Sequence, residues 1–397
     1  MKYWRGYLVA AIVAALTWGL VKFAEAHTVL IDMVYPYVTR ILVSSLADWS
    51  SAVDVCLWQL IVLVLAVGVL ASIVLMVLLR WNFFQWLGWI AAIASFVCLF
   101  HTAIFGLNYY AGDLADDVRL EVREYTVTEL EEATAFYRDR ANALARKIPR
   151  DADGKPKYPS FEEMAEAVGE GFDILTHEKA IPVFAGSTLP VKKLGWSDMY
   201  TSMGISGVTV AMTGEAAVNP QMPALSQPFT MCHEMAHRMS IASEQDANFA
   251  AYLACSVNPD VKIQYSAYFM AYRYCYSALN SISTSTARDC AARIREGLDP
   301  LFAQDLKDYN DFLIASQKQK AVEVANTVND TYLKVSGDGQ GVASYGEVCD
   351  LLVNLYIKEI ILPAQQEDAK ATFDPYDENQ VDLSGIVGAL PETQPED

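Results

Sequence analysis

Histidine and basic residues are scarce in this chain of 397 residues. It contains five histidines, and its 29 Lys and Arg residues face 48 Asp and Glu residues, which gives a formal net charge of −19. Residues 1–108 hold only five of the basic and four of the acidic residues, so residues 109–397 carry a charge of about −20. A surface with this charge repels nucleic acid and anionic lipid, which excludes a nucleic-acid-binding role.

Paired cysteines are also missing. None of the seven cysteines belongs to a Cys-x-x-Cys pair, and the five in the C-terminal part are an odd number. The sequence therefore predicts neither a disulfide framework nor a zinc site made of cysteines, and we expect buried free thiols.

Charged residues are absent from two long stretches near the N-terminus. Residues 55–79 and about 85–107 are apolar and uncharged, and a helix needs roughly 20 such residues to cross the hydrocarbon core of a bilayer. A shorter apolar run covers about residues 6–24, and the long side chain of Lys22 near its end can reach the interface between membrane and water. The competing interpretation of this run is a signal peptide cleaved after Ala26. We expect an uncleaved span, and thus a membrane region of three spans within residues 1–108.

The basic residues of this region predict its orientation. Lys2 and Arg5 precede the first span, and Arg80 lies between the second and the third. An excess of Lys and Arg marks the cytoplasmic side, which places residues 26–53 and the chain after about residue 108 outside, although Arg40 opposes this. We expect a multi-pass protein of a bacterial cell membrane with an extracytoplasmic domain at 109–362. The acidic, proline-bearing tail at 363–397 is predicted to be disordered.

The pattern of the extracytoplasmic part is mainly helical. Apolar and charged residues recur at helical spacing in most of it, and Ser160 with Glu163 forms a capping-box pattern. Residues 204–219 are the best strand candidate, because they are bounded by glycine and contain β-branched residues. The sequence therefore predicts a mainly α chain, whose soluble domain is a mostly helical α+β domain with a small sheet.

The chemistry is concentrated in the stretch FTMCHEMAHRMSIASEQDANFAAYLAC, residues 229–255. His233 and His237 are four residues apart, so on a helix they share one face and can bind one Zn²⁺ ion. Glu234 is next to the first histidine and can reach a water on such an ion. A metal that acidifies water and a carboxylate that takes its proton are what a hydrolase needs.

A catalytic zinc site needs a third protein ligand. His177 lies in a surface-like stretch, and we expect it to take no part. Ser243 can cap a second helix, whose first turn contains Glu244 and Asp246. Glu244 and Asn248 share one face of that helix, whereas Asp246 points about 160° away from Glu244. We expect Glu244 to be the ligand, with Asp246 as the alternative, and Asn248 to hydrogen-bond a ligand histidine or Glu244.

These residues resemble the gluzincin zinc metallopeptidases. The third ligand of that family is a Glu in an E-x-x-A-[DN]-x-x-A helix, which here reads Glu244-x-x-Ala247-Asn248-x-x-Ala251. Residues of about 10–360 also resemble an uncharacterised family of bacterial membrane proteins with short N-terminal spans followed by an HExxH domain. The stretches that match are GLNYY (106–110), TGEAAVN (213–219), residues 228–255, and VNDTYLK with GQGVASYG within 328–346. Two departures are Ser240 in place of a Gly and Asp246 in place of a Glu.

The resemblance implies a membrane-anchored, zincin-like metallopeptidase that takes one Zn²⁺ ion and acts on a peptide or protein by a zinc-activated water. Glu234 would be its general base. Two alternatives are a zinc hydrolase of a cell-wall amide and a catalytically inactive, zinc-stabilised binding or sensor module of the envelope. The sequence specifies neither a substrate nor a protein partner.

Overall fold

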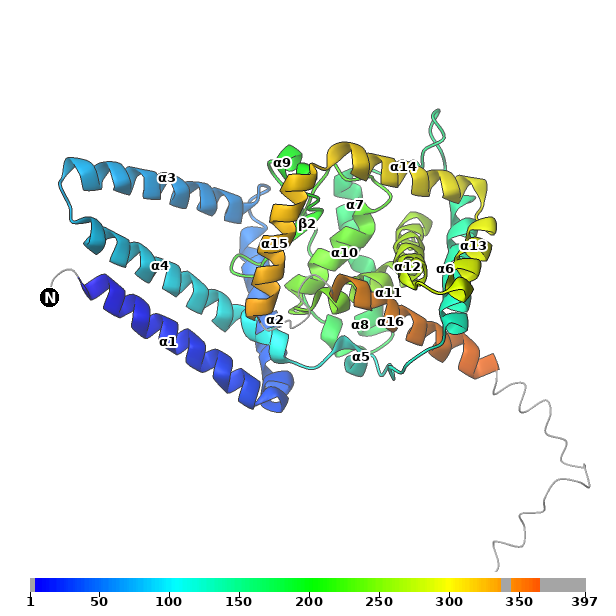
Figure 1. Ribbon diagram of the computed structural model, residues 1–397, viewed down its shortest axis with the longest axis horizontal. Coiled ribbons are helices and arrows are strands. Elements are labelled where there is room, and N and C mark those ends of the chain that lie inside the picture. Colours follow the sequence, from blue (N-terminus) through cyan, green and yellow to red (C-terminus); the bar gives the residue numbers. More distant parts are fainter. Residues whose placement is uncertain (1–3, 337–343, 365–397) are drawn as a thin grey trace, which may run out of the picture. The chain divides into compact units, whose positions relative to one another are not determined.

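The computed structural model describes residues 4–336 and 344–364, which are mostly helical with one small sheet (Figure 1). Four helices at the N-terminus are long and apolar enough to cross a membrane. They are α1 (Arg5–Ala26), α2 (Thr28–Ser50), α3 (Leu57–Leu78) and α4 (Phe83–Ile104). Helices α1, α3 and α4 correspond to the three predicted spans, whereas the patterns in the sequence had not predicted α2.

Two of these helices pack closely and one stands apart. Helices α1 and α4 lie side by side (Figure 1), and a Cβ atom added to Gly6 would lie 2.4 Å from the carbonyl carbon of Gly88. The two glycines therefore allow the backbones to approach, as small residues do between membrane helices. None of the residues in the most apolar stretch of α3 is buried within the protein.

The helical domain follows a short 3₁₀ helix, η2 (Gly106–Tyr110). Helix α6 (Val127–Ala145) packs along α12 (Val261–Ser281) and against α13 (Ser285–Glu296). Capping boxes begin α6 at Thr126 and α7 at Ser160, the second as predicted. The other helices of the domain are α5 (Leu114–Asp117), α7 (Phe161–Ala167), α8 (Gly169–His177), η3 (Pro182–Phe184), α9 (Ser197–Ser202), α14 (Pro300–Ser316), α15 (Gln319–Ser336) and α16 (Ser344–Tyr356).

The small sheet has three strands in the order β1-β3-β2. Strand β3 (Glu215–Val218) pairs in parallel with β1 (Lys192–Lys193) and antiparallel with β2 (Gly207–Val210). The single strand predicted at 204–219 is therefore wrong, because the chain turns back on itself between β2 and β3. Gly214 has φ = 68°, a conformation that glycine adopts readily, and a Cβ atom there would lie 2.2 Å from the backbone nitrogen of Ala47 in α2.

Helices α10 (Gln227–Arg238) and α11 (Glu244–Val257) pack against each other at the centre of the domain. Ala247, Ala250, Ala251 and Ala254 of α11 are fully buried, and side chains of this size let neighbouring helices approach. On the far side of α11, a Cβ atom on Gly171 of α8 would lie 2.1 Å from the carbonyl oxygen of Ala254. This close packing fixes the position of the two helices that contain the HExxH motif and Glu244.

The described chain as far as Leu355 forms one compact unit. After it, Ile357–Ile361 form a π-helix. The predicted acidic tail lies outside the described residues from residue 365 onward.

Candidate metal centre

Helix α10 presents the HExxH motif from the core of the domain. It begins at Gln227, with Pro228 in its first turn, where a missing N–H costs nothing. It ends at Arg238, which is only 2% exposed and donates hydrogen bonds to the carbonyl oxygens of Ser187 and Leu189. The C-terminal end of the motif helix is thus fixed by the surrounding chain.

The chain reverses direction between α10 and α11, and the second helix begins at Glu244 with Ser243 as its cap, as predicted. Ser240 has φ = 71°, a left-handed conformation that costs a serine about 1 kcal/mol more free energy than a glycine. The side chain of Ser243 then accepts a hydrogen bond from the backbone N–H of Asp246 at 3.4 Å and caps α11. This turn brings the first residue of α11, Glu244, back to the histidines of α10.

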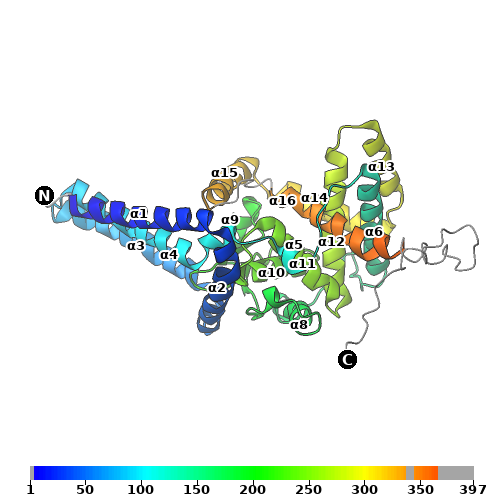
Figure 2. The ribbon, with the colours of Figure 1, turned by 90° about the horizontal axis from the view of Figure 1, so that it is seen from below.

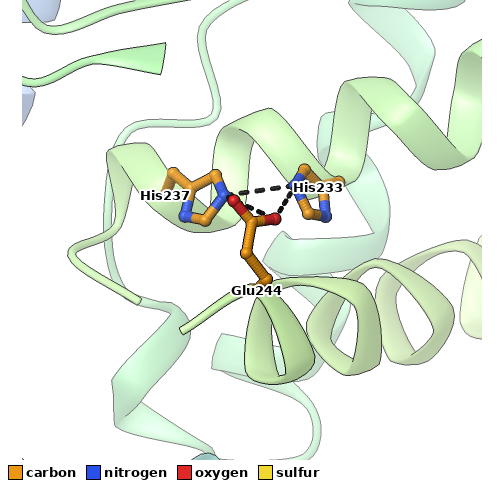
Figure 3. A group of neighbouring side chains, drawn as sticks. All are labelled: His233, His237 and Glu244. Carbon is orange, nitrogen blue, oxygen red and sulfur yellow. Dashed lines mark hydrogen bonds and ion pairs between the residues drawn. The ribbon is translucent and has the colours of Figure 1, made fainter. Parts of the chain in front are cut away.

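Three side chains converge at this point (Figure 3). His233 Nε2 lies 3.1 Å from His237 Nε2 and 3.2 Å from Glu244 Oε2, and His237 Nε2 lies 3.7 Å from the same oxygen. The side chains are 11 to 12% exposed. Of the described residues, these are the ones whose ligand atoms form a group suited to a metal ion. The structure therefore brings together the three predicted ligands.

The donor set fits a zinc ion. Ligands at about 2.0–2.1 Å from a tetrahedral zinc ion are roughly 3.3 Å apart, close to the three distances in this cluster. His237 Nδ1 lies 2.8 Å from the carbonyl oxygen of Ile241. When Nδ1 carries the proton and donates it to this oxygen, Nε2 is free to bind a metal. A hydrogen bond of this kind usually fixes that tautomer in metal-binding histidines. Two imidazoles and one carboxylate also suit other divalent ions.

Without a metal, the cluster holds a proton. Burial lowers the pKa of His237, but the carboxylates of Glu244 and Glu234 raise it by more, so that the pKa is about 9. Burial raises the pKa of Glu244, but contacts with His233 and His237 move it well below its usual range. A protonated imidazole that is paired with a carboxylate therefore occupies the place where a cation would bind.

Glu234 lies beside the cluster and is 4% exposed. Thr209 of β2 donates a hydrogen bond to Glu234 Oε2 at 2.7 Å. Burial raises the pKa of Glu234, and the nearby charges of His233 and His237 lower it in part. A carboxylate with a raised pKa next to a metal site is suited to accept and return a proton.

Two residues of β2 that the sequence analysis did not single out position this carboxylate. Besides Thr209, Gly207 leaves room for it, since a Cβ atom at Gly207 would lie 2.4 Å from Glu234 Oε1. The only signal in the sequence was a glycine and a threonine beside two valines in the stretch GVTV, residues 207–210.

Asp246, the alternative ligand, faces away from the three ligands. It lines a cavity of about 350 Å³ together with Asp113 and Asp117, and burial next to these acids raises its pKa to about 7. His177 is exposed at the end of α8, apart from the cluster.

Asn248 does not make the hydrogen bonds that were predicted for it. Its Oδ1 accepts a hydrogen bond from the hydroxyl group of Tyr274 at 3.1 Å, and its buried Nδ2 has no hydrogen-bond partner among the described residues. The expectation failed because α12 brings Tyr274 to this side of α11, which spacing along the chain does not reveal.

The fold and the cluster define a membrane-associated, mostly helical protein with a candidate His-His-Glu metal centre. Residues 32–353 match the family model described as a protein of unknown function (DUF3810), so the chain belongs to the DUF3810 family. This agrees with the resemblance to an uncharacterised family. No curated protein and no solved structure matches the chain.

Proposed function

We propose that this protein is a membrane-anchored, zinc-dependent metallopeptidase. The observation that carries the proposal is the convergence of His233, His237 and Glu244 within 4.8 Å of one another, next to the buried carboxylate of Glu234. The two histidines and Glu244 would hold the metal. A bound zinc ion would supply Lewis acidity to a water and to a substrate carbonyl group.

The residues of the chain would then do the following. Glu234 would take a proton from the attacking water and return it to the nitrogen of the leaving amine. The hydrogen bond from Thr209 would hold the Glu234 carboxylate in place. Strand β2 is at the edge of the sheet, so an extended peptide could add to it by backbone hydrogen bonds next to Glu234.

A second candidate function is a zinc-stabilised module without catalysis. The burial of Glu234, with one of its oxygens already bonded to Thr209, favours this alternative. Such a module would bind zinc as tightly as an enzyme but would not need a free carboxylate.

Metal content and peptide cleavage together test these proposals. We would purify the full chain in detergent and measure bound metal by mass spectrometry for wild type, His233→Ala, Glu244→Ala and Asp246→Asn. We expect about one zinc ion per chain in wild type and Asp246→Asn, and none in the other two. No metal in folded wild type after zinc has been added and the excess removed would refute the site.

Glu234→Gln then separates an enzyme from a binding module. In the metallopeptidase, this variant keeps zinc but loses cleavage of a peptide library. If wild-type protein with zinc cleaves no peptide but releases amines from cell-wall fragments, the reaction is hydrolysis of a cell-wall amide. If neither substrate is cleaved, the zinc-stabilised module is the better account.

A further inference from the structure

Helix α2 buries polar side chains against the rest of the protein and leaves large apolar side chains exposed. Thr39 and Arg40 are 1% and 8% exposed and bind the helical domain. Six large apolar side chains elsewhere around the helix are 43 to 73% exposed; they are Leu30, Met33, Val34, Tyr37, Val38 and Ile41. An apolar face of this size needs a partner that excludes water.

Helix α2 crosses the ends of the other long helices and does not run alongside them. Near its start, Ile31 clusters with Ala24 at the end of α1. In its middle, the hydroxyl group of Tyr35 donates a hydrogen bond to the carbonyl oxygen of Thr102, and Val43 clusters with Ile104 at the end of α4.

At its end, α2 approaches the start of α3. The Lys192 ammonium group donates to the carbonyl oxygen of Ser50 and to Glu215, which in turn accepts hydrogen bonds from the N–H groups of Leu57 and Trp58. One end of each of the three spans thus lies at a successive position along α2. In Figure 2, α2 accordingly turns away from the direction that α1, α3 and α4 share.

We propose that α2 does not cross the bilayer but lies in its interfacial layer. Its apolar face, defined by Leu30, Met33, Val34, Tyr37, Val38 and Ile41, is immersed in lipid, and the side that contains Thr39, Arg40 and Val43 binds the helical domain. An interfacial helix of this kind buries its apolar face roughly 5–10 Å deep at the boundary between headgroups and acyl chains. Lipid is the occupant because this face is continuous with the ends of three apolar spans.

The basic residues support this placement independently. With three spans, Arg80 between α3 and α4 lies on the same side as Arg5 before α1. If α2 were a fourth span, these arginines would lie on opposite sides, against the usual enrichment of Arg and Lys on one side. Three spans place the helical domain on the side opposite to the N-terminus.

The placement has a consequence for the candidate metal centre. Thr39 donates a hydrogen bond to Ser240 Oγ at 3.0 Å, and Arg40 Nε donates to the carbonyl oxygen of Met239 at 3.1 Å. Both acceptors belong to the turn that joins the ligand helices α10 and α11. The turn is therefore attached directly to a helix at the membrane surface.

Spin labels on the full chain in lipid nanodiscs test the proposal. Single cysteines would replace Leu30, Val34 or Val38 in a Cys98→Ser background, and depth would be read from collisions with oxygen and with a nickel complex. A spanning helix changes depth by about 1.5 Å per residue, or about 12 Å over these eight residues. We expect instead a similar, shallow depth at all three. Leu70, Val74 and Leu78 of α3 have the same spacing and are also exposed; they should give the full change.

A depth profile in α2 like that of α3 would overturn the proposal, and so would labels that collide only with the nickel complex.

Sidedness provides a second readout that does not depend on labels in α2. Cysteines replacing Trp4, Arg80 or Lys307 would be probed with an impermeant thiol reagent in sealed vesicles. We expect Trp4 and Arg80 on one side and Lys307 on the other. Trp4 and Lys307 on the same side would mean four spans.

Discussion

At the scale of single residues, the metal competes with a proton for His237. The pKa of His237 is raised to about 9 in the metal-free fold, above its value of about 6.5 in an unfolded chain. At pH 7 the imidazole must therefore lose a proton before zinc binds. We expect zinc binding to release about one proton at pH 7 and to tighten as the pH rises toward 9. Isothermal calorimetry in buffers of different ionisation enthalpy measures this release.

The same shift predicts how the stability of the metal-free protein depends on pH. A raised pKa stabilises the fold below about pH 6.5, and the contribution is lost as the pH rises through about 9. In a chelator, the unfolding temperature should fall over this window. Glu244→Gln removes the carboxylate partner and should flatten the dependence. An equal slope in wild type and variant would show that another group is responsible.

Gly207 provides a residue-scale test of the role of Glu234. In Gly207→Ala, the new Cβ atom would lie 2.4 Å from Glu234 Oε1, so the flexible carboxylate must move while the three metal ligands stay in place. We expect normal zinc content and a loss of peptide cleavage of about tenfold to a hundredfold. Cleavage at the wild-type rate in Gly207→Ala would argue that the position of Glu234 does not matter for the reaction.

At the scale of elements, a buried ion pair links the sheet to the first turn of α3. Glu215 of β3 is 1% exposed and accepts hydrogen bonds from the N–H groups of Leu57 and Trp58 at 2.7 and 2.8 Å and from Lys192 at 2.7 Å. Glu215→Ala leaves the Lys192 ammonium group and two helix N–H groups without this partner. We expect a loss of about 3 kcal/mol in the free energy of unfolding, measured by denaturation in detergent.

An exposed ion pair provides the control for Glu215→Ala. Lys307 and Asp311 of α14 lie 2.6 Å apart, and their side chains are 65% and 58% exposed. Water screens such a pair, so Asp311→Ala should leave stability unchanged within error. A similar loss in both variants would mean that burial does not distinguish the two ion pairs.

The difference between local and long-range information explains what the sequence could predict. The spacing of His233 and His237 and the cap at Ser243 depend on a few neighbouring residues, and they identified the cluster in advance. The partner of Asn248 and the hairpin of β2 and β3 depend on α12 and α2, which are distant in the chain. Helix α2 was missed because polar residues interrupt an otherwise apolar stretch, and only the fold reveals that Thr39 and Arg40 face the helical domain.

At the scale of the whole molecule, the helical domain depends on α2–α4. One buried cluster joins Val43, Ile104 and Phe105 to Ala211 and Ala242 of the domain. In addition, Arg40 donates hydrogen bonds to the carbonyl oxygens of Met239 and Pro182. The described chain accordingly forms one compact unit from these helices to Leu355. The boundary predicted at residue 108 thus cuts through shared packing.

A fragment of residues 109–397 tests this dependence. It would expose the apolar surface that α2 and α4 cover and leave Glu215 without the N–H groups of α3. The turn between α10 and α11 would lose Thr39 and Arg40 as partners, so the metal ligands would no longer be held together. We expect the fragment to aggregate and to bind less than one zinc ion per chain, whereas the full chain in detergent is monodisperse. A monodisperse fragment with the helix content and zinc of the full chain would contradict this expectation, since the domain would then fold without the membrane helices.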